Sequence, residues 1–388
     1  MTAPAAADVV RDATALADTW RARRGERQTR RHLERADFDA LASIGFLLGA
    51  VPADQGGWWS GAASTARPLC ETLRTLAAGD PSVTLVSAMH PAVLGYWLAT
   101  DDPSQAAWTE QRRAVFATAA AGSQYGTITS EPGSGGDILR TRTRAVPLDD
   151  RHAEIPGAVY AITGDKHFGS GYGISDYMFT TAVADGEDAP SAFVLDMRPV
   201  HAGTSSAATV TGEWDGAGMA ATQSHAARLE AMPGIRLAYD GPIDTLVFNA
   251  GPFVMTLFTA VLLGVFDEAI ATARAQLAPK RETLRAYEQV EWSRADLEHW
   301  LAVQAYEGAL RAIEAGDPFR ALQAALRAKT ATAELVEQAL RRITQVLGGG
   351  TFSRRSPFAS WFEDVRALGF LRPPWGLAFD NLFATSFD

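Results

Sequence analysis

The hydrophobic pattern of the chain changes its period twice, and no other feature limits the possible folds as strongly. From Ala6 to about Thr118, apolar residues recur at the spacing of amphipathic helices. From about Ala121 they alternate or form short runs separated by turn residues, as β-strands do. After Pro252 the helical spacing returns and continues to about Leu347. We therefore expect helical, then strand, then helical structure along the chain.

This order predicts an α+β multidomain protein. We expect an N-terminal all-α domain at residues 1–120, a central β-barrel-like domain at 121–242 and a C-terminal four-helix bundle at 243–388. A chain of 388 residues, 47% of them hydrophobic, can bury a separate core in each of these parts.

Composition argues against several classes of protein. The net charge of −10 disfavours nucleic acid as the main partner. Cys70 is the only cysteine, so no internal disulfide can form and a reducing, cytoplasmic location is expected. The stretch from Thr245 to Phe266 is uncharged and long enough to span a bilayer. Because Gly251-Pro252 interrupts it and a charged helical pattern follows, we expect a buried bundle helix and no membrane partner.

Arginines crowd the first helical stretch of the chain. Glutamates interleave with them and no apolar segment of a targeting signal follows, so they predict a solvated helical face, with a polyanion-binding arm as the alternative. They are Arg21, Arg23, Arg24, Arg27, Arg30, Arg31 and Arg35.

Three Asp-Pro pairs predict helix starts, because aspartate is a good N-cap and proline fits the first helical position. They are Asp80-Pro81, Asp102-Pro103 and Asp317-Pro318. Within the strand-like region, Gly164-Asp165 suits a two-residue hairpin turn.

Two segments rich in glycine and polar residues carry the clearest functional signal. Thr129 to Asp137 contains two hydroxyl groups near its start, a carboxylate and several glycines, and Thr163 to Gly171 lies between two apolar runs. The glycines permit positive φ and close backbone approach, and hydroxyl and N–H groups can bind a polar ligand. From composition alone, an ordinary surface turn is the alternative for the first segment.

Together the two segments resemble the flavin-contacting segments of the acyl-CoA dehydrogenase superfamily, a TEPxxGSD loop followed by a GxKxxIT/SxG strand. Gly216 to Ser224 resembles the hairpin GmRaTxS of that family, with Ala220 in place of its arginine. The order all-α, all-β, all-α is also that of the superfamily. The resemblance covers the whole chain and implies a flavin held between the β domain and the bundle.

The resemblance implies a role for each of several residues. Thr129 and Ser130 would meet the pyrimidine edge of the flavin, Phe168 would stack on its ring, and Ser170 would reach N5.

In the C-terminal half, Gln345, Gly348 and Gly349 belong to a stretch that matches the QxxGGxGF turn of the family. That turn contacts the adenosine end of FAD across a dimer, which favours FAD over FMN and implies a homodimer or homotetramer. The turn also reads as a glycine C-cap of a helix. Arg281 stands where the family places an arginine that reaches a neighbouring subunit's pyrophosphate, and a solvated helix arginine is its alternative.

The base of the acyl-CoA dehydrogenases is not found. In the family, a glutamate shortly after an RDa signature takes the α-proton of the substrate. Here the signature reads Glu363-Asp364, an ungapped count puts Arg372 on that glutamate, and a second known location falls near Val254. An arginine is no base at pH 7, so Arg372 is expected to act as a fixed cation in the flavin and substrate cavity. If the two prolines after it divert the chain, it instead lies on the surface.

The strand from Lys166 to Gly171 resembles the KhFxSG strand of the flavin monooxygenases built on the same fold, which need no such base. His90 is a candidate catalytic group at the end of an apolar helix, with a satisfied core histidine as the alternative. No metal site is expected.

We therefore expect an FAD-dependent oxidoreductase with monooxygenase-type chemistry on a small molecule. An acyl-CoA dehydrogenase with an unidentified base and a catalytically silent binding or assembly subunit are the alternatives. Because no nicotinamide-binding fingerprint occurs in the sequence, a monooxygenase would need a separate flavin reductase or electron-transfer partner.

Overall fold

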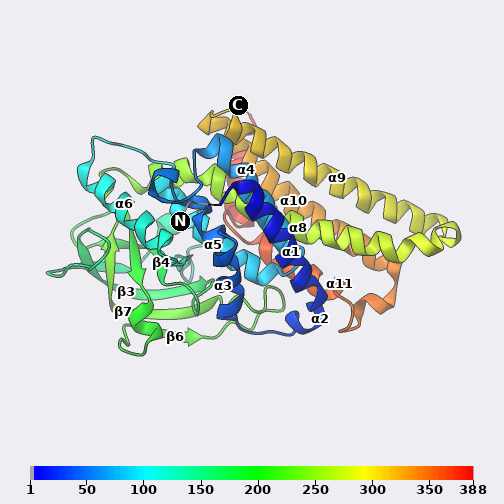
Figure 1. Cartoon of the computed structure of the whole chain (residues 1–388), viewed down its shortest axis with the longest axis horizontal. Helices are drawn as coiled ribbons and strands as arrows, with labels where there is room; N and C mark the ends of the chain where they lie inside the picture. The colour runs from blue at the N-terminus through cyan, green and yellow to red at the C-terminus, as the bar shows by residue number, and fades with distance from the viewer. Residues whose placement is uncertain (1–3, 388) are drawn as a thin grey trace.

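A computed structural model describes residues 4–387 and shows the three expected parts (Figure 1). The β domain lies at one end, and the long helices α8, α9 and α10 extend to the other. The N-terminal helices α4 and α5 pack on α8, and α5 also contacts strand β1. The all-α, all-β, all-α architecture predicted from the sequence is confirmed.

The N-terminal part is helical, with α1 (Ala6–Ala22), α2 (Arg24–Arg27), α3 (Arg35–Ser43), α4 (Ala62–Ala77), α5 (Pro81–Leu98) and α6 (Ala106–Ala120). Helix α5 starts as predicted, because the Asp80 carboxylate accepts a hydrogen bond from the Val83 N–H at 2.9 Å. The start predicted at Asp102-Pro103 is wrong. Asp102 accepts hydrogen bonds from Ser104 and Gln105 in a turn, and α6 begins only after that turn.

The strands of the β domain are β1 (Tyr125–Thr127), β2 (Arg144–Leu148), β3 (Val159–Gly169), β4 (Tyr177–Ala184), β5 (Pro190–Asp196), β6 (Ala208–Gly212) and β7 (His225–Arg236), with the short helix α7 (Arg198–His201) between β5 and β6. Five of them pair in the circuit β4–β2–β3–β7–β5–β4, which closes the sheet on itself as a barrel does. Apolar side chains such as Ile162, Phe193 and Leu229 fill the interior.

The hairpin turn predicted at Gly164-Asp165 is wrong, because β3 runs straight through both residues. Gly164 pairs with Leu229 of β7 and lies so close to Thr143 that an added Cβ would be 2.3 Å from Thr143 Oγ1. The glycine here serves a close approach of two segments.

The C-terminal part contains α8 (Ile243–Leu277), α9 (Ala286–Glu314), α10 (Pro318–Leu347), α11 (Phe358–Gly369) and α12 (Trp375–Ala384). Asp317 caps α10 through the N–H groups of Phe319 and Arg320, as predicted. Gly348 ends α10 with a φ of 84°, which confirms the predicted glycine C-cap.

Helix α8 is the apolar stretch noted in the sequence. By length and composition it could cross a membrane, but 78% of its most apolar stretch is buried inside the protein. Its residues Leu257 and Val261 share one core with Leu69 and Leu73 of α4. The burial agrees with the expected core helix of the bundle.

The boundaries predicted for the three domains fall between secondary-structure elements. Helix α6 ends at Ala120, and α8 begins at Ile243. The assignment of domains to 1–120, 121–242 and 243–388 stays a prediction.

Candidate functional site

A large cavity lies where the β domain meets helices α5 and α8 and the connection between α11 and α12. Its volume is about 690 Å³. The structure brings five residues predicted for the site to its lining: Thr129, Ser130, Phe168, Ser170 and Arg372. These residues come from segments far apart in the sequence, and the fold places them around one space.

The glycine-rich segment forms one wall of the cavity as a tight turn after β1. Gly133, Gly135 and Gly136 all have positive φ, and Ser134 stabilises the turn by donating to the Glu131 carbonyl at 3.0 Å. Gly136 also lies against the segment after α11, since an added Cβ would be 2.7 Å from Pro374. The turn therefore needs glycine both for its backbone conformation and for its contact with the bundle.

A buried ion pair holds this turn to strand β3. Lys166 Nζ donates to Glu131 Oε1 at 2.7 Å and to the Thr181 carbonyl at 2.7 Å, and both charged side chains are almost fully buried. Glu131 also accepts from the Arg142 N–H at 2.7 Å and the Thr143 hydroxyl at 2.7 Å. Burial alone would raise the pKa of Glu131, but these donors outweigh it and lower the pKa to about 2. Glu131 therefore stays ionised and fully engaged.

Phe168 presents its ring to the cavity from a strained backbone position. Its φ is 55°, which is unusual for an aromatic residue, and its side chain is exposed. The neighbouring residue His167 is held by a hydrogen bond from its N–H to the Ser130 carbonyl at 2.8 Å. Trp214 packs edge-on against the Phe168 ring, with 6.1 Å between centroids. The ring is therefore available to a flat ligand.

Hydroxyl groups form a short chain beside the ring of Phe168. Ser170 Oγ lies 2.9 Å from Ser224 Oγ, which lies 2.7 Å from Thr222 Oγ1. Thr222 donates onward to the Met219 carbonyl at 2.8 Å. Because each hydroxyl has one hydrogen, donation by Thr222 orders the chain: Ser224 donates to Thr222, Ser170 donates to Ser224, and Ser170 is left to accept a hydrogen bond from a ligand N–H.

The opposite wall of the cavity is apolar. It includes Met89 and Tyr96 of α5 together with Val254 and Phe258 of α8. The ring of Tyr96 stacks on Phe179 at 4.5 Å. Burial raises the pKa of Tyr96, so this phenol is neutral at physiological pH.

Arg372 enters the cavity from the segment between α11 and α12, where it donates a hydrogen bond to Thr129 Oγ1. The alternative in which the two prolines divert it to the surface is not what the structure shows. Burial lowers the pKa of Arg372, while Tyr96 and Asp137 act in the opposite direction, and an arginine keeps its charge at physiological pH in either case.

Lys329 of α10 braces the segment that carries Arg372. Its side chain is fully buried, and Nζ donates to the carbonyls of Gly369 at 2.7 Å and Pro373 at 2.9 Å. The ring of Trp375 lies 5.5 Å away. Burial lowers the pKa of Lys329 to about 7. A neutral amine has two N–H donors, so the carbonyls of Gly369 and Pro373 can accept both of them.

Lys329→Met is expected to destabilise the protein by about 1–3 kcal/mol at neutral pH, because two buried carbonyls lose their donor. The folded-state pKa lies below the usual 10.5 of lysine, so between pH 7 and 10 the unfolded chain binds more protons than the folded one. The stability of the wild type relative to the variant should therefore rise with pH in this window, by up to about 1.4 kcal/mol per pH unit. Urea unfolding of both proteins at several pH values measures this, and a pH-independent difference would contradict it.

His90 does not reach the cavity. It is buried between α5 and the β domain, where Nε2 lies 3.0 Å from the Leu47 carbonyl and Nδ1 accepts from the Tyr125 N–H at 3.2 Å. Burial lowers its pKa to about 4, so the ring is neutral. The catalytic role predicted for His90 has no support in this geometry, and the alternative of a satisfied core histidine fits it.

The remaining predicted cofactor residues do not line the cavity either. Arg281 lies at the surface in the connection between α8 and α9, where it pairs with Glu282. Gln345 accepts from the Tyr287 hydroxyl at 3.3 Å, and Gly348 and Gly349 follow at the end of α10. Figure 1 places these helix ends away from the β domain. Their contact with a cofactor therefore stays a prediction that needs a neighbouring subunit.

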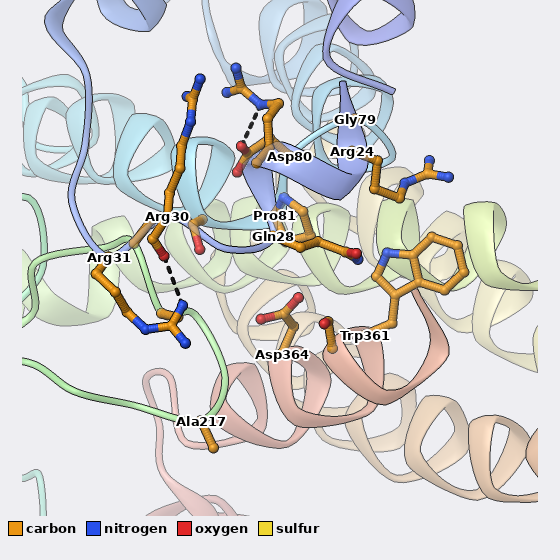
Figure 2. Close-up of a pocket in the computed structure, with 15 residues that line it drawn as sticks. Arg24, Gln28, Arg30, Arg31, Gly79, Asp80, Pro81, Ala217, Trp361 and Asp364 are labelled. Carbon is orange, nitrogen blue, oxygen red and sulfur yellow. Dashed lines mark hydrogen bonds and ion pairs between the residues drawn. The ribbon is translucent and has the colours of Figure 1, made fainter. Parts of the chain in front are cut away.

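A smaller cavity of about 120 Å³ lies between the N-terminal arginines and α11 (Figure 2). Asp364 and Trp361 line it from α11, and Arg24, whose guanidinium lies over the Trp361 ring at 4.9 Å, faces them. The Asp364 carboxylate accepts from the Met219 N–H at 2.7 Å and so ties α11 to the β domain. Ala220, at the place of the family's arginine, also lines this space.

The expected solvated face of arginines is wrong for part of the cluster. Arg27 is buried and pairs with Asp80 at 2.7 Å and Asp37 at 3.0 Å. Arg30 pairs with Asp37 at 2.9 Å. Because the chain turns after α2, these side chains point into the junction of the N-terminal helices, where acidic residues meet them.

Several residues of the site were not selected from the sequence. Glu131 and Lys166 were part of the recognised segments, yet their pairing is decided by the fold. Ser224 belongs to the stretch that resembles GmRaTxS, a signal that could have selected it, and Trp214 lies two residues before that stretch. Lys329 carries no local signal at all, since it is one basic residue in a long amphipathic helix.

Comparisons with known proteins bear on the family and the fold. Residues 257–372 match the acyl-CoA dehydrogenase, C-terminal domain, family. The dibenzothiophene monooxygenase of Rhodococcus erythropolis is 26% identical over 281 residues, a match that covers 69% of this chain and 61% of that protein. The chain thus spans less than two thirds of the length of this relative.

Two solved structures share the fold over nearly the whole chain. FMN-bound TdsC from Paenibacillus sp. A11-2 has a TM-score of 0.80 at 19% identity and covers 98% of each chain. Butyryl-CoA dehydrogenase from Megasphaera elsdenii has a TM-score of 0.81 at 16% identity, covering 99% of this chain and 98% of that one. The resemblance to the acyl-CoA dehydrogenase superfamily expected from the sequence is confirmed.

Proposed function

We propose that this chain, which has the acyl-CoA dehydrogenase fold, is a flavin-dependent oxidoreductase with monooxygenase-type chemistry on a small, largely apolar molecule. One observation supports this most. Among residues 4–387, Glu131 is the only carboxylate lining the large cavity, and its oxygens already accept hydrogen bonds from Lys166 and Thr143. In the ungapped count, Arg372 stands at the position of the family's glutamate base, and Val254 stands near the second known location of that base. The cavity therefore offers no free carboxylate to abstract an α-proton from a thioester.

The residues of the cavity fit a flavin. The exposed ring of Phe168 can stack on a flat heterocycle, Ser170 offers a hydroxyl beside it, and the N–H groups and hydroxyls of Thr129 and Ser130 can meet polar ring atoms. A bound flavin would supply electron transfer and oxygen activation. The apolar wall formed by α5 and α8 would exclude water from the reacting face, as such chemistry requires.

We propose FAD as the cofactor and a homodimer or homotetramer as the assembly. Exposed apolar residues recur along one face of α9, and they would be covered by another subunit: Tyr287, Val290, Leu297, Trp300 and Leu301. Gln345 and Gly348, near the start of this face, would then serve the adenosine end of a neighbour's FAD. FMN is the alternative, supported by the FMN-bound neighbour. Chromatography of the released cofactor distinguishes the two.

The reaction class is tested by two parallel experiments on the flavin-loaded protein. In the first, acyl-CoA thioesters are mixed anaerobically with the protein, and we expect the absorbance of the oxidised flavin to persist. In the second, a flavin reductase and labelled oxygen are supplied with indole or dibenzothiophene as probes, and we expect one labelled oxygen atom in the product by mass spectrometry. Rapid bleaching by any thioester would instead mean dehydrogenation with an unidentified base.

A catalytically silent subunit is the remaining alternative. It predicts a protein that is purified without flavin and takes none up from solution. Equilibrium dialysis against FAD and FMN decides this before any assay of turnover. We place the protein in the cytoplasm, with a separate flavin reductase as its partner, as part of the same proposal.

A further inference from the structure

Arg372 is a cation without an anionic partner in the large cavity. Across residues 4–387, the ion pairs within 4.0 Å do not include Arg372, and its one side-chain hydrogen bond goes to the neutral hydroxyl of Thr129. Glu131 is engaged by Lys166, and Asp137, which accepts from the Leu139 N–H at 2.9 Å, acts on Arg372 only from beyond 4.0 Å. A guanidinium has five N–H donors in a planar fork, so most of its binding capacity is free.

The surroundings make this unpaired charge costly. The lining of the cavity includes Leu371, Phe370, Tyr96 and Phe258, none of which carries a charge at neutral pH. Arg372 is partly buried, and an unpaired cation beside an apolar wall is less favourable than one paired with an anion. The counter-ion is therefore expected to arrive with a ligand of the cavity.

The guanidinium is also held in place before any ligand binds. Lys329 fixes the segment through the carbonyls of Gly369 and Pro373, and Gly136 packs against Pro374 from the other side. These contacts from two elements hold the segment that carries Arg372, and so restrict its guanidinium to one part of the cavity. A planar, pre-positioned fork suits a carboxylate, which can accept two parallel N–H bonds.

We infer that the substrate of this site is an apolar, ring-sized carboxylic acid. Its carboxylate pairs with Arg372, and its apolar body lies against Met89, Tyr96 and Phe258. This inference rests on the proposed function in one respect, because it takes the large cavity as the substrate site. It adds the chemical class of the substrate, which the proposed function leaves open.

The test compares ligands that differ only in charge. Naphthoate with naphthamide, and indole carboxylate with indole carboxamide, are titrated into the flavin-loaded protein without reductant, and binding is followed by the absorption of the flavin and by calorimetry. In the wild type we expect each carboxylate to bind about 10- to 100-fold more tightly than its amide. In Arg372→Met this preference should fall to about twofold or less, while the Kd for flavin changes by less than about threefold.

Two further variants keep the test decisive. Arg113→Met removes an exposed arginine of α6 and should leave the carboxylate preference intact. Arg372→Lys keeps the charge but loses the planar fork, so it should retain only part of the preference, and it replaces Arg372→Met if that variant does not fold.

Two results would overturn the inference. The first is equal binding of carboxylate and amide in the wild type. The second is a preference that survives in Arg372→Met, and if flavin affinity falls in the same variant, Arg372 is assigned to the cofactor. Because these equilibria need neither oxygen nor turnover, the inference can fail while the proposed oxygen chemistry stands, and the reverse holds as well.

Discussion

Glu131→Ala is expected to lower the free energy of unfolding by about 3–5 kcal/mol, the largest effect on stability foreseen for the site. The substitution leaves the ammonium of Lys166, which is 0% exposed, without its carboxylate partner. It also leaves the Arg142 N–H and the Thr143 hydroxyl without their acceptor. Since these donors belong to the segment that follows the glycine-rich turn, the cavity wall should loosen as well. Urea unfolding measures the loss.

Two controls distinguish the cost of leaving a buried charge unpaired from the cost of losing an ion pair of any kind. The double variant Glu131→Ala with Lys166→Met removes both charges and should recover part of the stability, because no unpaired ion stays buried. Asp165 lies on the same strand as Lys166 and pairs with Arg228 of β7, where both side chains are about half exposed, so Asp165→Ala should cost much less stability than Glu131→Ala. If Asp165→Ala and Glu131→Ala cost the same, burial of the pair is not what matters.

The same pair predicts a response to acid. The pKa of Glu131 is lowered to about 2 in the folded protein, below the usual 4.5 of a glutamate. Its contribution to stability is therefore complete above about pH 4.5 and is lost as the pH falls toward 2. Glu131→Ala should accordingly lose less stability than the wild type between these pH values.

Phe168→Ala combined with Ser170→Ala is expected to raise the Kd for flavin by about 10- to 100-fold. Loss of an aromatic stacking partner costs about 0.5–1.5 kcal/mol, and loss of a hydrogen bond costs a similar amount. Both side chains line the cavity at the end of strand β3. Fluorescence titration of the apoprotein with FAD and FMN gives the Kd.

Phe168→Gly distinguishes a ligand contact from a structural role. Because Phe168 has a φ of 55°, glycine relieves backbone strain there, so the variant should unfold at the same or higher urea concentration than the wild type while its flavin affinity falls. Phe319→Ala, which removes a similarly exposed ring on α10, serves as the matched control. Full flavin affinity in Phe168→Gly would place the cofactor elsewhere.

Much of the fold could be predicted from the chain alone, because its signals are local. The change of period near Ala121, the N-caps at Asp80 and Asp317 and the glycine at 348 all act through residues a few positions apart. The two local predictions that failed, at Asp102 and at Gly164, failed because other contacts of these residues proved stronger.

The site depends on contacts that no local pattern contains. Glu131 and Lys166 are 35 positions apart, and Thr129 and Arg372 are 243 apart. Composition and motif resemblance selected most of the cavity residues, but they gave no reason to choose between a buried and a surface Arg372, or between a catalytic and a core His90. The closed sheet and the packing of α5, α8 and α10 bring Arg372 to the cavity and bury His90 away from it, because the tertiary structure determines which partners each polar group has.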